Sequence, residues 1–508
     1  MNTRIPRPEY PRPQFKRESW VNLNGTWTYT FDFSKSGVQR GFAHSEGFDD
    51  HITVPFCPES ELSGVGYKDF IEMMWYQRPL AIPEDWGDLG SSSGLGSSSG
   101  RRIILHFGAV DYESEVFIGH YGCRDGQSVG RHWGGTSSFS YDITPYVVPG
   151  ETHSLVVYVR DETRSGVQPG GKQCPDFKSR GCHYTRTTGI WQTVWMEAVS
   201  PYGLRDCQII PDLDGARFVI VPRFFAEMRG LRFRVTLLDA GSQIAQVESP
   251  ASNGLVCGVP IANPKIWSPE NPFLYDLVFE VLDAEDNVLD TVSSYAGLRK
   301  VHIEGNQLYL NNAPCYLRLV LDQGFYPDGI WTAPSDEALK RDIELAMRAG
   351  FNGARLHQKV FEPRFHYWAD RLGYLTWGES SSWGMTLEDE DSPKPEISVR
   401  AKIGARNFLS EWREIITRDR NHPSIIAWTP FNETRYRGEG RQHNRLHVDA
   451  YDLTHALDPT RPVNDASGYV HVKTDIWTVH TYQQDPEVLK SQLTPDPEAG
   501  FFRNFPDK

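Results

Sequence analysis

Hydrophobic and polar residues alternate in short runs over the first 200 residues, and Gly, Pro, Asn and Asp separate the runs. A period of two is typical of β-strands that bury one face. The clearest runs span residues 26–33, 74–82, 102–110, 114–119, 153–160 and 193–199. Their number and spacing predict a jelly-roll-like β-sandwich over residues 1–200.

A segment rich in Gly and Ser, residues 87–100, interrupts this first region. Its composition is typical of a flexible linker between domains. The flanking runs, 75–83 and 101–110, nevertheless indicate consecutive strands of one sheet. We therefore expect the segment to form the tip of a hairpin and not a domain boundary.

Residues 201–298 contain a second set of alternating runs with turn residues between them. These runs span 216–225, 231–239, 275–283 and 290–297. About 100 residues with this pattern predict an immunoglobulin-like β-sandwich. The motif WSPENPFLY at 267–275 is expected to hold the chain where it enters this domain.

The pattern changes after residue 299, where apolar strand-like runs alternate with amphipathic helical runs. Repeated strand–helix units with strands this apolar predict a parallel sheet, and specifically a (β/α)8 TIM barrel over residues 299–508. The strand-like runs account for six of the eight strands and span 313–321, 352–357, 374–379, 425–433, 461–467 and 475–482. The helical runs span 335–350, 362–373, about 400–420 and about 440–456.

The first of these helices shows the pattern clearly. Ser335, followed by Asp336 and Glu337, is a typical helix start. Its apolar side chains fall mostly on one face, which is expected to pack on the barrel strands. They are Ala338, Leu339, Ile343, Leu345, Ala346 and Met347.

Polar side chains follow the predicted barrel strands, and the carboxyl ends of barrel strands share one mouth where function lies. We therefore expect a polar ring rich in carboxylates. Its members are Asp322, Arg355, His357, Glu379, Asn432, Glu433, Asp465, His480 and Tyr482.

Glu433 is the candidate general acid within this ring. It closes the apolar run that begins at Ser424, and Trp377 and Trp428 are expected to wall its carboxyl group. Loss of hydration favours the neutral form of a carboxyl group, which can then protonate a leaving oxygen near pH 7. Asn432 offers an amide for a sugar hydroxyl, while Arg355 offers either a fork of donors for substrate or an ion pair that ties strand ends together.

Charge and composition exclude several other kinds of partner. The chain has 52 basic and 66 acidic residues, with a formal charge of -14 and no basic run, which argues against nucleic acid. No stretch approaches about 20 apolar residues, so no membrane span is predicted. The 15 Trp are consistent either with indole rings that stack on sugars or with side chains that pack in the core. No CxxC or HExxH motif occurs, and no metal or cofactor is predicted.

The N-terminus and the cysteines bear on the cellular compartment. The first 20 residues lack the apolar core of a secretory signal. Seven cysteines, an odd number spread over a long chain, favour reduced thiols and a cytoplasmic location. Cys174 and Cys182 are close enough to pair, although two free thiols are favoured.

A set of motifs covering almost the whole chain resembles glycoside hydrolase family 2. The motifs are VNLNGTW, FGAVDYESEVFIG, TTGIWQTVW, WSPENPFLY, GLRKVHIEGNQLYLNNAP, FNGARLH, ADRLGYLTWGE and HPS followed by IIAWTPFNE. Their order, with a sandwich, an immunoglobulin-like domain and then a barrel, matches that of the family.

This resemblance implies a retaining exo-β-glycosidase. Asn432 and Glu433 match the family's Asn-Glu pair after the fourth strand, with Glu433 as acid/base. Arg355 matches the arginine after strand two, and Tyr482 matches a tyrosine of strand six. His357 and Glu379 lie where family members carry substrate or metal contacts.

The chain departs from the family pattern at the second carboxylate that retaining hydrolysis needs. Family members carry this nucleophile, a Glu, after the seventh strand, but the 26 residues after Tyr482 contain no such Glu context. From Pro314 onward there are 195 residues, whereas the barrel typically takes about 250. We therefore expect a C-terminally truncated chain whose nucleophile lies beyond residue 508.

Three hypotheses remain open. The first is an exo-β-glycosidase, β-galactosidase-like by preference, that uses Glu433; the second is a carbohydrate-binding protein without hydrolysis. The third is a barrel hydrolase that uses Glu379, or less favourably Asp465. In each case the partner is a carbohydrate, and a homo-oligomer remains open. The expected substrate-binding residues are Asn432, Arg355, His357, Asp322, Glu379, Tyr482, His480 and Trp428.

Overall fold

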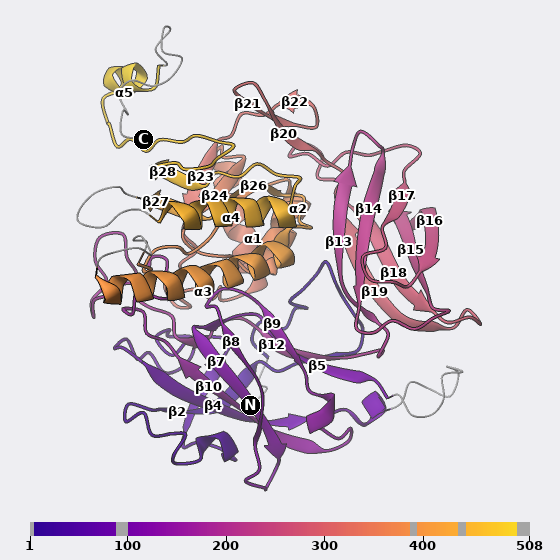
Figure 1. The fold of residues 1–508 in the computed structure, drawn as a ribbon, viewed down its shortest axis with the longest axis vertical. Helices are drawn as coiled ribbons and strands as arrows, with labels where there is room; N and C mark the ends of the chain where they lie inside the picture. The colour runs from indigo at the N-terminus through magenta and orange to yellow at the C-terminus, as the bar shows by residue number, and fades with distance from the viewer. Residues whose placement is uncertain (1–4, 88–99, 387–393, 435–442, 495–508) are drawn as a thin grey trace.

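A computed structural model describes residues 5–87, 100–386, 394–434 and 443–494. A β-rich N-terminal region, a second β-sandwich and a helix-bearing C-terminal region follow one another along the chain, and all three lie against one another (Figure 1). No helix of the described residues is long and apolar enough to cross a membrane.

The N-terminal region packs a six-stranded antiparallel sheet against a four-stranded one. Alternate side chains of both sheets, such as Trp27, Tyr76, Leu105 and Met196, are fully buried in one core, as the alternating sequence pattern requires. The six-stranded sheet has the order β3 (Asp50–Val54), β2 (Gly25–Phe31), β4 (Met73–Ala81), β10 (Thr152–Arg160), β7 (Glu113–His120), β8 (Gln127–Trp133). The other has the order β1 (Trp20–Asn22), β12 (Val194–Val199), β5 (Arg102–Phe107), β9 (Phe139–Asp142), and β6 (Val110–Asp111) pairs with β11 (Gly189–Ile190).

The prediction that the runs around the Gly/Ser segment are neighbours in one sheet is wrong. β4 belongs to the six-stranded sheet, whereas β5 belongs to the four-stranded sheet. A period of two shows which side chains of a strand are buried, but both sheets of a sandwich share the same core, so the pattern does not assign a strand to a sheet. Residues 88–99, where the hairpin tip was predicted, lie outside the described residues.

The second sandwich buries its own core, which includes Phe218, Phe233, Tyr275 and Phe279. One sheet has the order β13 (Leu204–Asp212), β14 (Arg217–Phe224), β17 (Cys257–Pro260). The other has the order β16 (Ser242–Pro250), β15 (Arg232–Asp239), β18 (Tyr275–Leu282), β19 (Val288–Ala296). A small sheet then follows, made of β20 (Val301–Glu304), β21 (Gln307–Leu310) and β22 (Ala313–Pro314).

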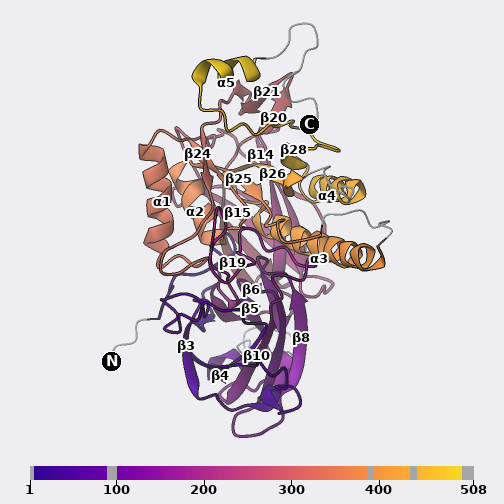
Figure 2. The same ribbon diagram turned by 90° about the vertical axis from the view of Figure 1, so that its left-hand side faces the viewer.

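The C-terminal region is built from parallel strands with helices on both sides. Helices α1 and α2 lie on one side of the strands and α3 and α4 on the other (Figure 2). The strands form the parallel sheet β23 (Leu319–Asp322), β24 (Gly353–Leu356), β25 (Leu375–Glu379), β26 (Ile425–Thr429) and the parallel pair β27 (Phe431–Thr434), β28 (Ala466–Tyr469). The helices are α1 (Asp336–Arg348), α2 (Pro363–Leu372), α3 (Pro395–Asp419), α4 (Asn444–Leu457) and α5 (Pro486–Gln492).

Two expectations for this region need correction. Residues 475–482, predicted as the sixth barrel strand, form no strand, so the polar side chains there are carried by irregular chain. In α1 the Ser335 hydroxyl caps the helix as predicted, accepting a hydrogen bond from the Ala338 amide at 3.2 Å. Leu345 and Met347, however, are 43% and 37% exposed, so the buried face is narrower than predicted.

A buried polar junction joins the second sandwich to the C-terminal region. The Asp370 carboxylate of α2 accepts hydrogen bonds from the Tyr295 hydroxyl at 2.8 Å and from the Ser424 amide at 2.9 Å, and lies 2.6 Å from Nδ1 of His422. The indole Nε1 of Trp267 donates to the Asp370 carbonyl at 2.7 Å. Trp267 comes from the motif that was expected to anchor the domain, and it is fully buried.

We predict that Trp267→Ala lowers the free energy of unfolding by about 3–5 kcal/mol, because it leaves a large cavity and an unpaired carbonyl at this junction. The measurement is the shift of the first urea-unfolding transition. Trp133→Ala is the control, since Trp133 is 44% exposed and its loss should cost far less. Equal shifts for the two variants would contradict this role for the junction.

Candidate active site

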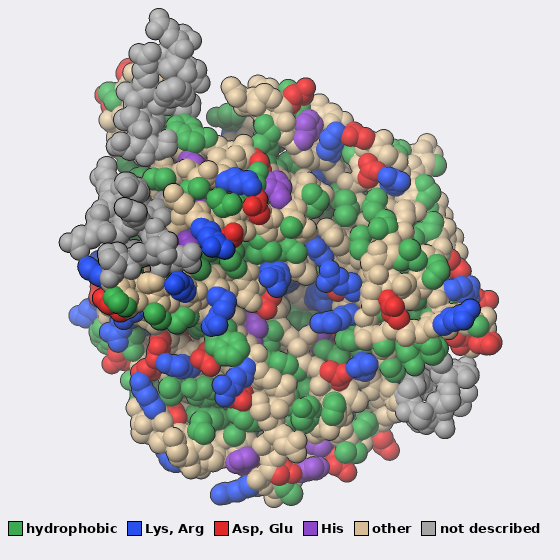
Figure 3. Space-filling model, viewed as in Figure 1, with side chains coloured by type: hydrophobic (Ala, Val, Ile, Leu, Met, Phe, Trp, Pro, Cys, Tyr) green, Lys and Arg blue, Asp and Glu red, His purple; other side chains and the backbone are tan. Residues whose placement is uncertain are grey.

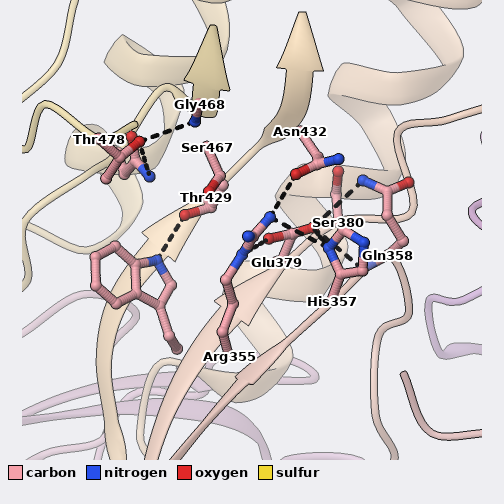
Figure 4. Close-up of polar contacts among 12 residues, drawn as sticks. Arg355, His357, Gln358, Glu379, Ser380, Thr429, Asn432, Ser467, Gly468 and Thr478 are labelled. Carbon is pink, nitrogen blue, oxygen red and sulfur yellow. Dashed lines mark hydrogen bonds and ion pairs between the residues drawn. The ribbon is translucent and has the colours of Figure 1, made fainter. Parts of the chain in front are cut away.

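The ends of three parallel strands are joined by the half-buried guanidinium group of Arg355. Arg355, at the end of β24, donates from Nε to Oε2 of Glu379 on β25 at 2.6 Å and from Nη2 to Oδ1 of Asn432 on β27 at 2.6 Å (Figure 4). The parallel register brings these ends level, since Arg355 lies opposite Trp377. The ion-pair role left open for Arg355 is therefore present in the structure.

Glu379 is held on both carboxylate oxygens. Its Oε1 lies 2.9 Å from Nδ1 of His357 and accepts hydrogen bonds from the backbone amide and side-chain amide of Gln358 at 3.1 and 3.3 Å. Burial raises the pKa of the Glu379 carboxyl, but the Arg355 charge and the His357 contact outweigh burial and lower the pKa to about 2. Glu379 is therefore an ionised, fully enclosed anchor, and its contacts do not favour a nucleophilic role.

Glu433 reaches the same polar cluster from the residue after Asn432. Neighbouring side chains of a regular strand point to opposite faces, but Glu433 has a φ of +48°, in the left-handed region that side chains other than Gly rarely adopt. This break in the strand turns the carboxylate toward the chain that carries His480 and Tyr482. Such strained backbone is characteristic of functional sites.

The structure corrects the predicted protonation of Glu433. His480 Nδ1 lies 2.8 Å from Oε1, and the Tyr482 hydroxyl donates to the same oxygen at 3.1 Å. Burial raises the pKa of the Glu433 carboxyl, but these two contacts more than offset burial, so the pKa is lowered and not raised. The irregular segment around His480 was not expected to contact Glu433 in this way.

Two predicted ring members, Asp322 and Asp465, lie elsewhere, as does Trp428, which was predicted to wall Glu433 and bind substrate. Trp428 is fully buried on the helix side of the sheet, edge-on to Trp412, and donates to Asp458. Asp322 accepts a bond from the Gly324 amide and makes no hydrogen bond to Arg355, Glu379 or Glu433 within the described ranges. Asp465 is held by its own loop through His471 and the amides of 466, 472 and 473. A strand end carries side chains of both faces, so position along the strand does not reveal which side chain points inward.

Lys172 of the N-terminal sandwich approaches the cluster and was missed in the sequence. It lies between β10 and β11, is 5% exposed, and its Nζ is 5.3 Å from the ring centre of Trp383. Trp383 in turn donates from Nε1 to the Asn432 carbonyl at 3.1 Å. Burial lowers the pKa of the Lys172 ammonium group, while the Glu433 and Glu379 carboxylates raise it, and the net shift is downward.

Glycine allows this close approach. Gly171 has a φ of +58°, and a Cβ there would collide with the Gln358 carbonyl. Its amide instead donates to the Ser381 carbonyl at 3.0 Å and the Trp383 carbonyl at 3.1 Å. The Gly-Gly-Lys sequence in a long loop was the only available signal for this contact. Cys174 and Cys182 of the same loop are free thiols, as favoured from the sequence.

Two family models match the chain over adjoining segments. "Glycosyl hydrolases family 2" matches residues 232–299, and "Glycosyl hydrolases family 2, TIM barrel domain" matches residues 301–499. This chain belongs to glycoside hydrolase family 2. The resemblance found in the sequence is thereby confirmed, as is the TIM-barrel class of its C-terminal region.

Named relatives of this family 2 chain include enzymes for two kinds of sugar. A "Beta-glucuronidase" of Paenibacillus borealis is 24% identical over 473 residues, covering 89% of this chain and 74% of the relative. A "Beta-galactosidase" of Photobacterium profundum is 32% identical over 488 residues, covering 92% of this chain but only 42% of the relative. The crystal structure of Ruminococcus gnavus beta-glucuronidase shares the fold, with a TM-score of 0.73 and 23% identity over 90% of this chain and 74% of that one.

The family 2 chain has no evident metal site in the part that the structure describes. No group of three or more His, Cys, Asp or Glu there is arranged to hold a metal ion. His357 and Glu379, where the resemblance allowed a metal contact, instead bind each other and Arg355.

We predict that the ionisation of Glu379 makes the free energy of unfolding of the chain depend on pH at pH values below the ordinary pKa of a glutamate. Because its pKa falls from 4.5 to about 2 on folding, the carboxylate stabilises the fold above pH 4.5 and loses this effect as the pH falls toward 2. Glu379→Gln should therefore cost about 3 kcal/mol near neutral pH, and its deficit relative to wild type should shrink between pH 4.5 and 2. Thermal unfolding of both proteins between pH 4.5 and 2 measures this difference in stability.

The exposed carboxylate Glu46 provides the matched control, since Glu46→Gln removes the same charge at the surface. A deficit for Glu379→Gln that does not change with pH would contradict the ionised, paired state assigned to Glu379.

Proposed function

We propose that this chain supplies the acid/base centre of a retaining exo-β-glycosidase, with Glu433 as the group that protonates the leaving oxygen. The supporting observation is the way in which Glu433 is held. His480 and Tyr482 both engage Oε1, whereas Oε2 makes no hydrogen bond to any described residue. One oxygen is thus positioned and the other is left for a substrate.

Proton donation near neutral pH requires a pKa of Glu433 higher than its contacts in the described structure favour. A second carboxylate about 5–5.5 Å away, as in retaining glycosidases, would raise it by like-charge repulsion. Glu379 and Asp465 are both held by other groups, so we expect the attacking group to be another glutamate, outside the described residues. The hydrolase that uses Glu379 is the less supported alternative for the same reason.

The amide of Asn432 is suited to hold the sugar. Arg355 occupies its Oδ1 and fixes the amide plane, and the buried Nδ2 has no hydrogen-bond partner in the described structure. A buried donor without a partner costs about 1–3 kcal/mol, so a sugar hydroxyl that accepts this bond would offset the cost. Asn432 is therefore proposed as a substrate ligand beside Glu433.

The preferred sugar has two candidates. A β-galactoside is the preference drawn from the sequence, and relatives named for both β-galactosidase and β-glucuronidase activity are consistent with either class. One observation favours a β-glucuronide. Lys172 is a largely buried side chain close enough to Glu433 and Glu379 for their charges to raise its pKa, and its ammonium group has no hydrogen bond or ion pair to any described residue. A uronate carboxylate would supply a partner.

We predict that Glu433→Gln slows hydrolysis of alkyl β-glycosides by about 10²–10⁴-fold, because Gln cannot donate the proton that a poor leaving group needs. Nitrophenyl glycosides, whose leaving groups need little protonation, should be affected less in the glycosylation step. Steady-state kinetics with both substrate types measure the difference, and Glu46→Gln is the control. Binding of sugars by the wild-type chain without any hydrolysis would instead support the carbohydrate-binding alternative.

We predict that Lys172→Met separates the two sugars. It should lower kcat/KM for nitrophenyl β-glucuronide by about 10²-fold, because losing one partner of a buried charge pair costs about 2–5 kcal/mol. The kcat/KM for nitrophenyl β-galactoside should change far less. Lys178→Met, an exposed lysine of the same loop, is the control. Equal losses of kcat/KM on both substrates would mean that Lys172 acts on the ionisation of Glu433 and does not select the sugar.

A further inference from the structure

A pocket remote from Glu433 lies where the three regions of the chain meet. It has a cavity volume of about 380 Å³, within the roughly 300–1,000 Å³ typical of small-molecule sites. Side chains from β5, β12, β13 and α3 line it, and a hollow bordered by Lys and Arg is visible on this face (Figure 3). We call it the interdomain pocket. None of its lining residues belongs to the cluster around Arg355 and Glu433.

Three arginines of the interdomain pocket lack partners. Arg205 and Arg223 come from the second sandwich and Arg413 comes from α3. None of the three makes a hydrogen bond or ion pair to any residue in the described ranges. They come from two regions of the chain and are exposed, so their donors face solvent at the pocket.

The acidic residues of the pocket do not neutralise these arginines, because each already has another partner. Glu197 is 3.2 Å from Arg17 and 3.0 Å from His106, and Glu362 binds Arg7 at 2.6 Å. Glu414 is 2.9 Å from His132, and Asp206 binds Arg12 at 3.3 Å. The spare charge at the pocket is therefore positive.

A β-bulge brings two of the arginines together. The pairing of β13 with β14 shifts between Leu204 and Asp206, and Asp206 then pairs with Arg223. Arg205 is the extra residue, and bulges of this kind redirect a side chain. Asp206 lies directly opposite Arg223, whereas the extra residue Arg205 has no residue paired with it across the strands.

The remaining wall of the pocket suits a sugar ring better than a bare anion. Trp195 stacks on His106 with ring centres 4.8 Å apart, and Phe139 and Phe225 are half-buried beside them. Gln192 is 5% exposed, and its Nε2 has no hydrogen-bond partner in the described structure. Aromatic faces with a few fixed polar groups are typical of sites for carbohydrates and other small molecules.

We propose that the interdomain pocket binds an acidic oligosaccharide, with Arg205, Arg223 and Arg413 contacting its carboxylate groups and the aromatic wall contacting its rings. Arginine suits this role because its planar fork matches a carboxylate through two parallel hydrogen bonds. The site is separate from Glu433 and does not depend on the proposed hydrolysis.

The test measures binding of tetragalacturonate to the whole chain by calorimetry, at low and at moderate salt. The double variant Arg205→Ala/Arg223→Ala should bind at least about tenfold more weakly, in line with the loss of charged contacts. Arg229→Ala, an exposed arginine of the same sandwich, is the matched control and should bind as wild type does. Lys172→Met should also leave this binding unchanged, which separates it from binding at the candidate active site.

Two further probes identify the ligand class. Maltotetraose, which is neutral, should not show binding that depends on Arg205 and Arg223. Inorganic sulfate should compete only weakly with tetragalacturonate. Three results would each overturn the proposal. The first is that Arg229→Ala weakens tetragalacturonate binding as much as the double variant does, and the second is that binding does not depend on Arg205 and Arg223. The third is that sulfate binds tightly while tetragalacturonate does not bind.

Discussion

The ion pair between Arg355 and the fully buried Glu379 is the contact on which the candidate active site depends. Removing Arg355 would leave the Glu379 carboxylate, which is fully buried, without its charged partner, and such a loss costs more than the loss of an exposed pair. Because Arg355 also binds Asn432, the same pair joins β24, β25 and β27 at their carboxyl ends. This pair thus helps to position the Asn432 side chain, together with the pairing of β27 with β28 and the Trp383 indole bond to the Asn432 carbonyl.

Similar buried polar contacts hold the regions of the chain together. Asp370 receives donors from the second sandwich and from the loop before β26, and the Gly171 loop of the first sandwich donates to carbonyls beside Trp383. Such contacts are directional, so they fix the angle at which domains meet as well as the affinity between them. Lys172 can approach the barrel cluster only because that angle is fixed.

The protonation of Glu433 shows how a local argument can reach the wrong sign. Burial alone would raise the pKa, as the apolar run before Glu433 suggested. His480 and Tyr482, nearly 50 residues further along the chain, place two contacts on one oxygen and reverse the shift. The contacts therefore favour an ionised and positioned Glu433 carboxylate.

The sequence by itself determined the order of the elements, the type of most of them and the strand ends that carry Arg355, Glu379, Asn432 and Glu433, because these depend on periodicity and on the geometry of parallel strands. Residues 475–482, predicted as a strand and found irregular, are the exception. It also indicated the family through motifs spread along the chain. Only the tertiary structure decided that β4 and β5 lie in different sheets, that Trp428 faces the helices, that His480 and Tyr482 bind Glu433 from irregular chain, and that Lys172 reaches the site. Periodicity reports which face of an element is buried, whereas these outcomes depend on contacts between residues far apart in the chain, and local patterns do not specify such contacts.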